Sequence, residues 1–324
     1  MSFRFAVHSA DGKGVPLAVA GKIMIDIQNL ISDIGCSQIK TKMRLFNSMP
    51  QELSDKFVIK INKITDKGIG SGTGEGGKYL TEMASDTLQE TLQYLGSGIT
   101  ETWMEDHFPD SFYRSRIARD LIELCDDLSG YELRYFIDKE TFSFKTLDRK
   151  NLSKYIGSNV PSREQMIGYV SMDPRSRKMT FLSSDKPVYL SKAVGDRFSQ
   201  GKIYLVMGTA SKDSSGKIIS LSSVDFMSVA DSISFRDIIT PDRYIRLANN
   251  VPVAISYDKN RKVWEFFCET INLGVSSPTW DDGIVLFHKK FAEMWDLYTM
   301  PGKTFSDERD QMIQGYMTTL IPLV

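Results

Sequence analysis

The chain has 324 residues, of which 41% are hydrophobic and 25% charged, and its net charge is −1. This length exceeds what one hydrophobic core usually serves, so we expect an α+β protein of two or three domains. The nearly neutral charge excludes a chain-wide electrostatic field that would attract nucleic acid or an anionic membrane, but it leaves local patches open.

The cysteines and the apolar stretches indicate where the protein works. Cys36, Cys125 and Cys268 lie far apart and form no C-x-x-C pair, which favours small buried packing residues in a reducing compartment. Residues 1–5 do not have the pattern of a signal peptide, and charged residues interrupt the apolar stretch from Val15 to Ile34. We therefore expect a cytoplasmic protein with no membrane segment.

Residues 1–160 are expected to form an N-terminal α+β domain that ends in a turn-rich linker near Gly157. The hydrophobic periodicity places its elements in chain order: a strand at 2–8, a helix from Val15 to about Ile34, strands at 41–47 and 56–65, helices at 78–95 and 112–128, and strands at 131–137 and 142–147.

A glycine-rich stretch separates the 56–65 strand from the next helix. Gly72, Gly77 and Lys78 fit the pattern G-x-x-x-x-G-K of a phosphate-binding loop, and the stretch lies between a strand and a helix. Tyr79 stands where such a loop needs Ser or Thr for magnesium. A flexible hairpin or a strand-to-helix loop is therefore the favoured interpretation, and a nucleotide-binding enzyme is the alternative.

Other catalytic patterns lead to no assignment. Glu101, Glu105, Asp106 and His107 form an acidic cluster that is more typical of a solvated turn than of a metal site. The sequence contains no G-x-S-x-G elbow, and His288 is expected on the surface of a helix. We assign no catalytic residue, no metal and no cofactor.

Residues 161–230 are expected to form a small β-barrel of SH3-like or OB-like size. Strands are indicated at 166–172, 178–183, 187–190, 202–210 and 217–226, with a short helix near 193–198. Residues 161–228 contain ten Lys and Arg against six Asp and Glu, a net charge of +4. Arg175, Arg177 and Lys178 cluster in one turn and are the candidate nucleic-acid contacts. The six aromatic residues of this segment are assigned either to stacking on bases or to the barrel core.

Residues 231–324 are expected to form a third domain. After a connection over 232–250, the pattern indicates a hairpin at 251–257 and 263–269, a third strand at 271–275, and helices at 279–298 and 307–318. Thr279, three residues before Asp282, has the spacing of a helix N-cap.

The stretch from Pro252 to Tyr298 resembles the HicB-like antitoxin domain family. The resemblance is carried by a strand ending in Tyr257-Asp258, a strand from Lys262 to Glu269, the segment Asn272-Leu-Gly-Val275, and a helix that begins at Thr279 with two acidic residues. It implies a small sheet-and-helix fold that binds a protein partner and has no catalytic carboxylates of its own.

Three functions follow as expectations. The leading one is a non-enzymatic interaction or regulatory protein of the antitoxin-like kind, in which Tyr257, Trp264 and Phe266 contact a protein partner. The alternative for these three aromatic residues is that they belong to the hydrophobic core. The second is a nucleic-acid-binding protein that uses the basic barrel. The third is a nucleotide-binding enzyme that uses the glycine-rich stretch.

Overall fold

The computed structural model describes residues 4–12, 14–65, 68–73, 78–97, 102–137, 140–144, 149–156, 162–173, 179–183 and 187–322. The chain divides into two compact units. Unit 1 comprises residues 1–41, 51–160 and 241–243, and unit 2 comprises residues 42–50, 161–240 and 244–324. Helices and strands are both abundant, as the expected α+β class requires.

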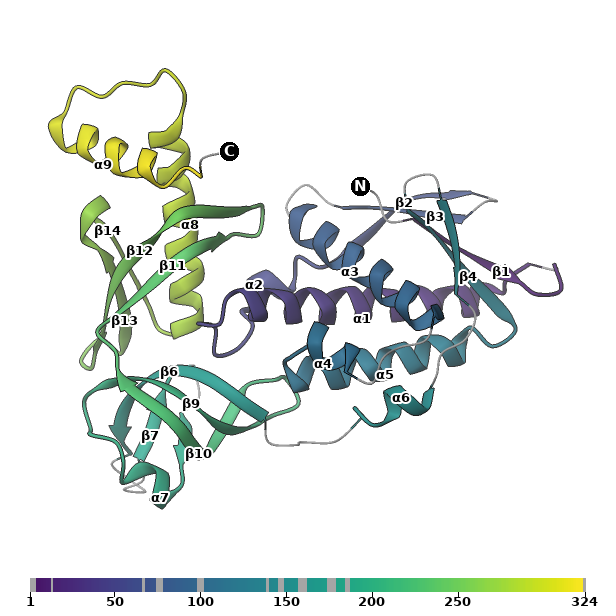
Figure 1. The fold of residues 1–324 in the computed structure, drawn as a ribbon, viewed down its shortest axis with the longest axis horizontal. Helices are drawn as coiled ribbons and strands as arrows, with labels where there is room; N and C mark the ends of the chain where they lie inside the picture. The colour runs from purple at the N-terminus through teal and green to yellow at the C-terminus, as the bar shows by residue number, and fades with distance from the viewer. Residues whose placement is uncertain are drawn as a thin grey trace. The chain divides into compact units, whose positions relative to one another are not determined.

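Unit 1 is built on a five-stranded sheet in the order β2-β3-β1-β4-β5, with every neighbouring pair antiparallel. Its strands are β1 (Arg4–Ser9), β2 (Ile59–Thr65), β3 (Gly68–Thr73), β4 (Tyr131–Ile137) and β5 (Glu140–Phe144). Its helices are α1 (Leu17–Lys42), α2 (Gln51–Ser54), α3 (Lys78–Ser97), α4 (Trp103–His107), α5 (Ser111–Asp127) and α6 (Arg149–Ser153). Figure 1 shows α1 and α5 running beside each other in this unit.

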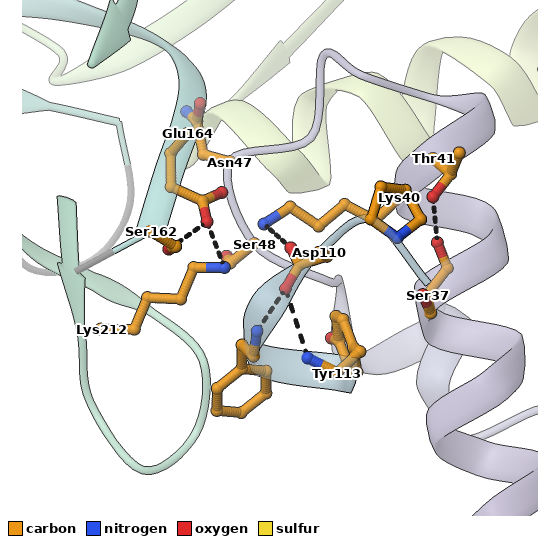
Figure 2. Close-up of polar contacts among 12 residues, drawn as sticks. Ser37, Lys40, Thr41, Asn47, Ser48, Asp110, Tyr113, Ser162, Glu164 and Lys212 are labelled. Carbon is orange, nitrogen blue, oxygen red and sulfur yellow. Dashed lines mark hydrogen bonds and ion pairs between the residues drawn. The ribbon is translucent and has the colours of Figure 1, made fainter. Parts of the chain in front are cut away.

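The pair of helices α1 and α5 is antiparallel, because contacts between them join the end of one to the start of the other. Lys40, near the end of α1, forms a 2.8 Å ion pair with Asp110, which caps the start of α5 (Figure 2). Lys22, near the start of α1, lies 3.5 Å from Asp127 at the end of α5. Both side chains of the Lys40–Asp110 pair are nearly buried, so this contact holds the two helix ends in register.

Unit 2 contains a closed barrel of five strands (Figure 1). The strands are β6 (Ser162–Met172), β7 (Met179–Leu182), β8 (Val188–Leu190), β9 (Ile203–Lys212) and β10 (Ile218–Val229), with the short helix α7 (Lys192–Gly195) between β8 and β9. Around the barrel the order is β6-β7-β8-β10-β9 and back to β6; β8 and β10 are parallel, and the other neighbours are antiparallel. The expected small barrel is therefore present.

The rest of unit 2 is a four-stranded antiparallel sheet in the order β11-β12-β13-β14, with helix α8 packed on it. Its elements are β11 (Ser232–Ile239), β12 (Tyr244–Asp258), β13 (Val263–Cys268), the 3-10 turn η1 (Glu269–Ile271), β14 (Leu273–Ser277), α8 (Trp280–Thr299) and α9 (Glu308–Thr319). The side chain of Thr279 accepts a 3.2 Å hydrogen bond from the Asp282 amide, so the predicted N-cap is confirmed.

Two sequence-based expectations about elements are wrong. Residues 41–47 are not a strand, because α1 continues to Lys42 and the following residues bond to other parts of unit 2. Residues 232–239 are a strand and not a connection. For the glycine-rich stretch, the structure has the hairpin of the two expected forms: residues 68–73 form the strand β3, which pairs with β2 in a hairpin and also with β1. Backbone pairing on both sides keeps β3 extended although glycine is a poor strand former.

The segment Lys42–Pro50, here called the strap, lies in unit 2. The Asn47 side chain makes two 2.8 Å hydrogen bonds to the backbone of Ile167 in β6, one as donor and one as acceptor. The Asp281 carboxylate at the start of α8 accepts from the amides of Asn47 and Ser48 and from the Ser48 hydroxyl, at 2.7–3.0 Å. The strap therefore joins the barrel to α8.

Candidate nucleic-acid interface

The outer face of the barrel presents Tyr189 to solvent. Val188 and Leu190 point into the barrel core, so Tyr189 between them points outward, and its side chain is 49% exposed. The strand register places Thr180 of β7 on one side of Tyr189 and Ser220 of β10 on the other. Tyr189 thus has one small hydroxyl residue beside it on each of the two neighbouring strands, and of these Thr180 is buried.

The barrel interior is closed to a ligand, because apolar side chains fill it. The core cluster includes Phe181, Phe198, Tyr204 and Leu221. At one end, Glu164 and Lys212 form a 2.6 Å ion pair whose side chains are 5% and 7% exposed, and the Ser162 hydroxyl donates to Glu164 (Figure 2). Any ligand of this barrel must therefore bind on its outer face.

Exposed apolar and cationic side chains border the outer face. Phe226 on β10 is 49% exposed and Ile219 is 43% exposed. Lys192 and Arg197 are exposed near α7, and the Arg197 guanidinium donates a 2.6 Å hydrogen bond to the Val224 carbonyl. Exposed aromatic rings and cations on one barrel have the composition of a surface on which single-stranded bases stack.

The candidate nucleic-acid contacts Arg175, Arg177 and Lys178 fall in the connection between β6 and β7 and lie outside the described residues. Of the six aromatic residues in the barrel segment, Phe181, Phe198 and Tyr204 belong to the core, whereas Tyr189 and Phe226 are exposed. Sequence reasoning did not separate these two groups. Strict alternation in Val188-Tyr189-Leu190 was the signal that would have placed Tyr189 outside.

The candidate partner-binding residues of the C-terminal domain lie mostly in its interior. Trp264 and Phe266 are each 1% exposed and contact the Trp280 ring at centroid distances of 4.9 and 5.1 Å. Tyr257 is half-buried and stacks on Tyr169 of the barrel with 4.7 Å between the ring centroids. Burial also raises the pKa of the Tyr257 hydroxyl. In this fold Trp264 and Phe266 pack beneath α8.

The candidate phosphate-binding residues are spread over different elements. Gly72 lies in β3, Lys78 is the first residue of α3, and Gly77 lies outside the described residues. Because β3 is antiparallel to both of its neighbours, this setting is unlike the parallel strand that precedes a phosphate-binding loop.

The histidine expected on a helix surface is in fact buried. His288 is completely inaccessible, and its Nδ1 accepts a 3.0 Å hydrogen bond from the Ile239 amide. Burial lowers the pKa of His288 to about 3, so its ring is neutral. Its Nδ1 also lies 3.3 Å from the Ile239 carbonyl oxygen. The edge strand β11, which the sequence did not reveal, covers this part of α8 and explains the error.

Three residues of the acidic cluster, Glu105, Asp106 and His107, lie in the short helix α4. Glu105 and Asp106 are exposed, and the His107 ring stacks on the Trp103 ring with 4.2 Å between the centroids. Glu101 lies outside the described residues. Within the part of the chain that the structure describes, no group of three or more His, Cys, Asp or Glu side chains could hold a metal ion.

All three cysteines are free and buried. Among the described helices, none is long and apolar enough to cross a membrane.

Comparison with known proteins adds no relative: no family model matches the chain, and neither the curated proteins nor the solved structures include a significant match.

Proposed function

We propose that this protein is a non-enzymatic, cytosolic binding protein whose barrel holds single-stranded nucleic acid on its outer face. The strand order carries the proposal. Numbered from β6, the barrel runs 1-2-3-5-4 and back to 1, with strands 3 and 5 parallel and a helix between strands 3 and 4. This connectivity supports an OB-type barrel, a fold that binds oligonucleotides on the face of its second and third strands.

The chemistry of that face supports the same proposal. Tyr189 lies on the third strand and offers an exposed ring to a base, and the basic triplet of Arg175, Arg177 and Lys178 belongs to the connection between the first and second strands. The barrel segment has a net charge of +4, which supplies a local attraction for phosphates in a chain whose overall net charge is −1.

The test is fluorescence anisotropy with labelled single-stranded DNA and RNA, measured at low and physiological salt. Tyr189→Ala is expected to weaken binding about tenfold, since stacking of one base contributes roughly 1–3 kcal/mol. Tyr94→Ala is the matched control, because Tyr94 in unit 1 is 48% exposed. Affinity that is insensitive to salt, or equal losses in both variants, would refute the proposal.

A second function is favoured by the C-terminal sheet, and we propose that it captures a protein partner, as the HicB-like resemblance implies. One face of the sheet packs on α8, and the opposite face presents Phe267, whose side chain is 43% exposed between the small residues Ala254 and Gly274. Since Trp264 and Phe266 are buried, this proposal now rests on Phe267.

An affinity pull-down from nuclease-treated lysate tests this second function. Phe267→Ser is expected to release a stoichiometric partner, whereas Met312→Ser, at a side chain that is 70% exposed on α9, is expected to retain it. A partner that survives the Phe267 change equally well would contradict this use of the sheet.

A further inference from the structure

Tyr169 presents a buried hydroxyl group that lacks a hydrogen-bond partner. Its neighbours in β6, Gly168 and Val170, face the barrel core, so Tyr169 points outward, yet its side chain is only 3% exposed. The Tyr169 hydroxyl is buried and makes no hydrogen bond with the described residues. A buried hydroxyl is normally paired, so an unpaired one indicates a missing partner.

A lysine and a glycine lie next to this hydroxyl. The Lys259 ammonium lies 5.4 Å from the centre of the Tyr169 ring. Gly201 has a φ of +85°, which L side chains rarely adopt. A Cβ placed on Gly201 would stand 3.4 Å from Lys259 Nζ and 3.7 Å from Tyr169 Oη. The two polar groups thus both lie next to the backbone of Gly201, at distances of ordinary van der Waals contact from the position of a Cβ.

The local charge at this place is positive. Lys259 and the neighbouring Lys202 are both exposed. The acidic group nearest in sequence, Asp258, turns its carboxylate to the backbone amides of Asn260 and Arg261 at 2.8 and 3.1 Å. That carboxylate is bonded within its own turn but keeps its negative charge, so the two lysines together exceed it by one charge.

We propose that Tyr169, Lys259 and the backbone of Gly201 form a binding site for one phosphate group of a nucleic-acid strand. Lys259 supplies the charge, and Tyr169 Oη donates the hydrogen bond that it otherwise lacks. Because the hydroxyl is covered in the unbound protein, the exposed side chain of Lys259 turns outward to admit the phosphate and then returns over it. This inference rests on the proposed nucleic-acid function and adds a contact on β6, away from the Tyr189 face.

Inorganic phosphate is the first probe, followed by amide NMR of the full chain with chloride at equal ionic strength as the control. Saturable shifts at Gly201 and Lys202 are expected with phosphate and not with chloride. Tyr169→Phe removes only the hydroxyl and Lys259→Met only the charge, and each is expected to weaken phosphate binding about tenfold. Lys262→Met, in the same turn, is the matched control. Lys259→Met changes an exposed residue and keeps the test valid if Tyr169→Phe disturbs the fold.

Two results would overturn the site: phosphate affinity that is unchanged in both variants, or shifts that phosphate and chloride produce alike. The oligonucleotide separates this inference from the proposed function. If single strands bind and depend on Tyr189 but not on Tyr169 or Lys259, the phosphate site is wrong and the barrel function stands. If phosphate binding depends on Tyr169 and Lys259 while single strands do not bind, the anion site stands, its assignment to nucleic acid is wrong, and the barrel function fails.

Discussion

Asp33 of α1 and Asp120 of α5 share a hydrogen bond between their carboxyl groups inside unit 1. The Arg116 guanidinium donates to Asp33 at 2.7 Å, so the shared proton belongs to Asp120. Burial, followed by the neighbouring Asp33 charge, raises the pKa of Asp120 to about 7. One heptad along the same helices, Asp26 is hydrogen-bonded to Asp127, and burial raises the pKa of Asp26 to about 6. Two carboxyl pairs therefore lie in one helix–helix contact.

The Asp120 pair predicts that unit 1 loses stability as the pH rises. The pKa of Asp120 is higher in the folded state than in the unfolded state. Its contribution to the stability of unit 1 is therefore complete below about pH 4 and is lost as the pH rises to about 7. Asp120→Asn keeps a donor for Asp33 and removes the titration, so we expect its unfolding free energy to vary roughly 2–4 kcal/mol less over this range.

Urea unfolding between pH 4 and 8 checks this prediction, with Trp103 as the fluorescent reporter of unit 1. Asp106→Asn, on the exposed surface of α4, serves as the control. If the stability of the Asp120→Asn variant varied with pH in parallel with that of the wild type, this result would contradict a proton shared between Asp33 and Asp120.

His288 predicts the opposite pH dependence for unit 2. Its pKa falls to about 3 on burial, below its unfolded value near 6.5, so the stabilisation is present above about pH 6.5 and is lost as the pH falls. His288→Gln retains an acceptor for the Ile239 amide and does not titrate. As the pH falls from 7 to 5, we expect the midpoint of unit 2 unfolding to move to a lower urea concentration in the wild type but not in this variant.

A Trp103→Phe background isolates the unit 2 signal, since the remaining tryptophans, Trp264, Trp280 and Trp295, belong to unit 2. A wild-type transition that stays constant over this pH range would mean that His288 becomes charged without unfolding the protein.

Asp281 is predicted to hold the strap in place. Asp281→Ala leaves two backbone amides of the strap without their acceptor, and we expect a loss of roughly 2–4 kcal/mol in the stability of unit 2. Asp282→Ala is the matched control: its carboxylate is exposed and, among the described residues, accepts from the Thr279 hydroxyl alone, so about 1 kcal/mol or less is expected. Equal losses in chemical denaturation would show that the strap does not depend on Asp281.

Gly283 is predicted to be required for the packing of α8. A Cβ at this position would lie 2.2 Å from Phe266 Cε2, well inside van der Waals contact. We expect Gly283→Ala to cost roughly 1–3 kcal/mol by overpacking, although alanine is the better helix former. Phe266→Leu in the same chain should recover part of this loss, and thermal unfolding measures both. A Gly283→Ala variant more stable than the wild type would contradict the tight contact.

The sequence was most informative where strict local patterns coincide with one buried face. The barrel strands, the hairpin of β12 and β13, and α8 with its Thr279 cap all follow from periodicity and end signals. β11 was missed because Arg236 and Asp237 interrupt its apolar pattern, and a bulge between Phe235 and Asp237 shifts its register. The sequence left a hairpin and a loop as alternatives for the stretch that forms β3, because glycines carry no side-chain pattern.

What the sequence alone determined is therefore the α+β class, the existence of the barrel and most element types, because these depend on interactions within a few residues. Only the tertiary structure decided the strand order of the barrel, the burial of His288, Trp264 and Phe266, and the exposure of Tyr189. It alone brought Tyr169, Gly201 and Lys259 together, from three separate segments. Such contacts depend on how distant segments pair, and no local pattern in the chain records that pairing.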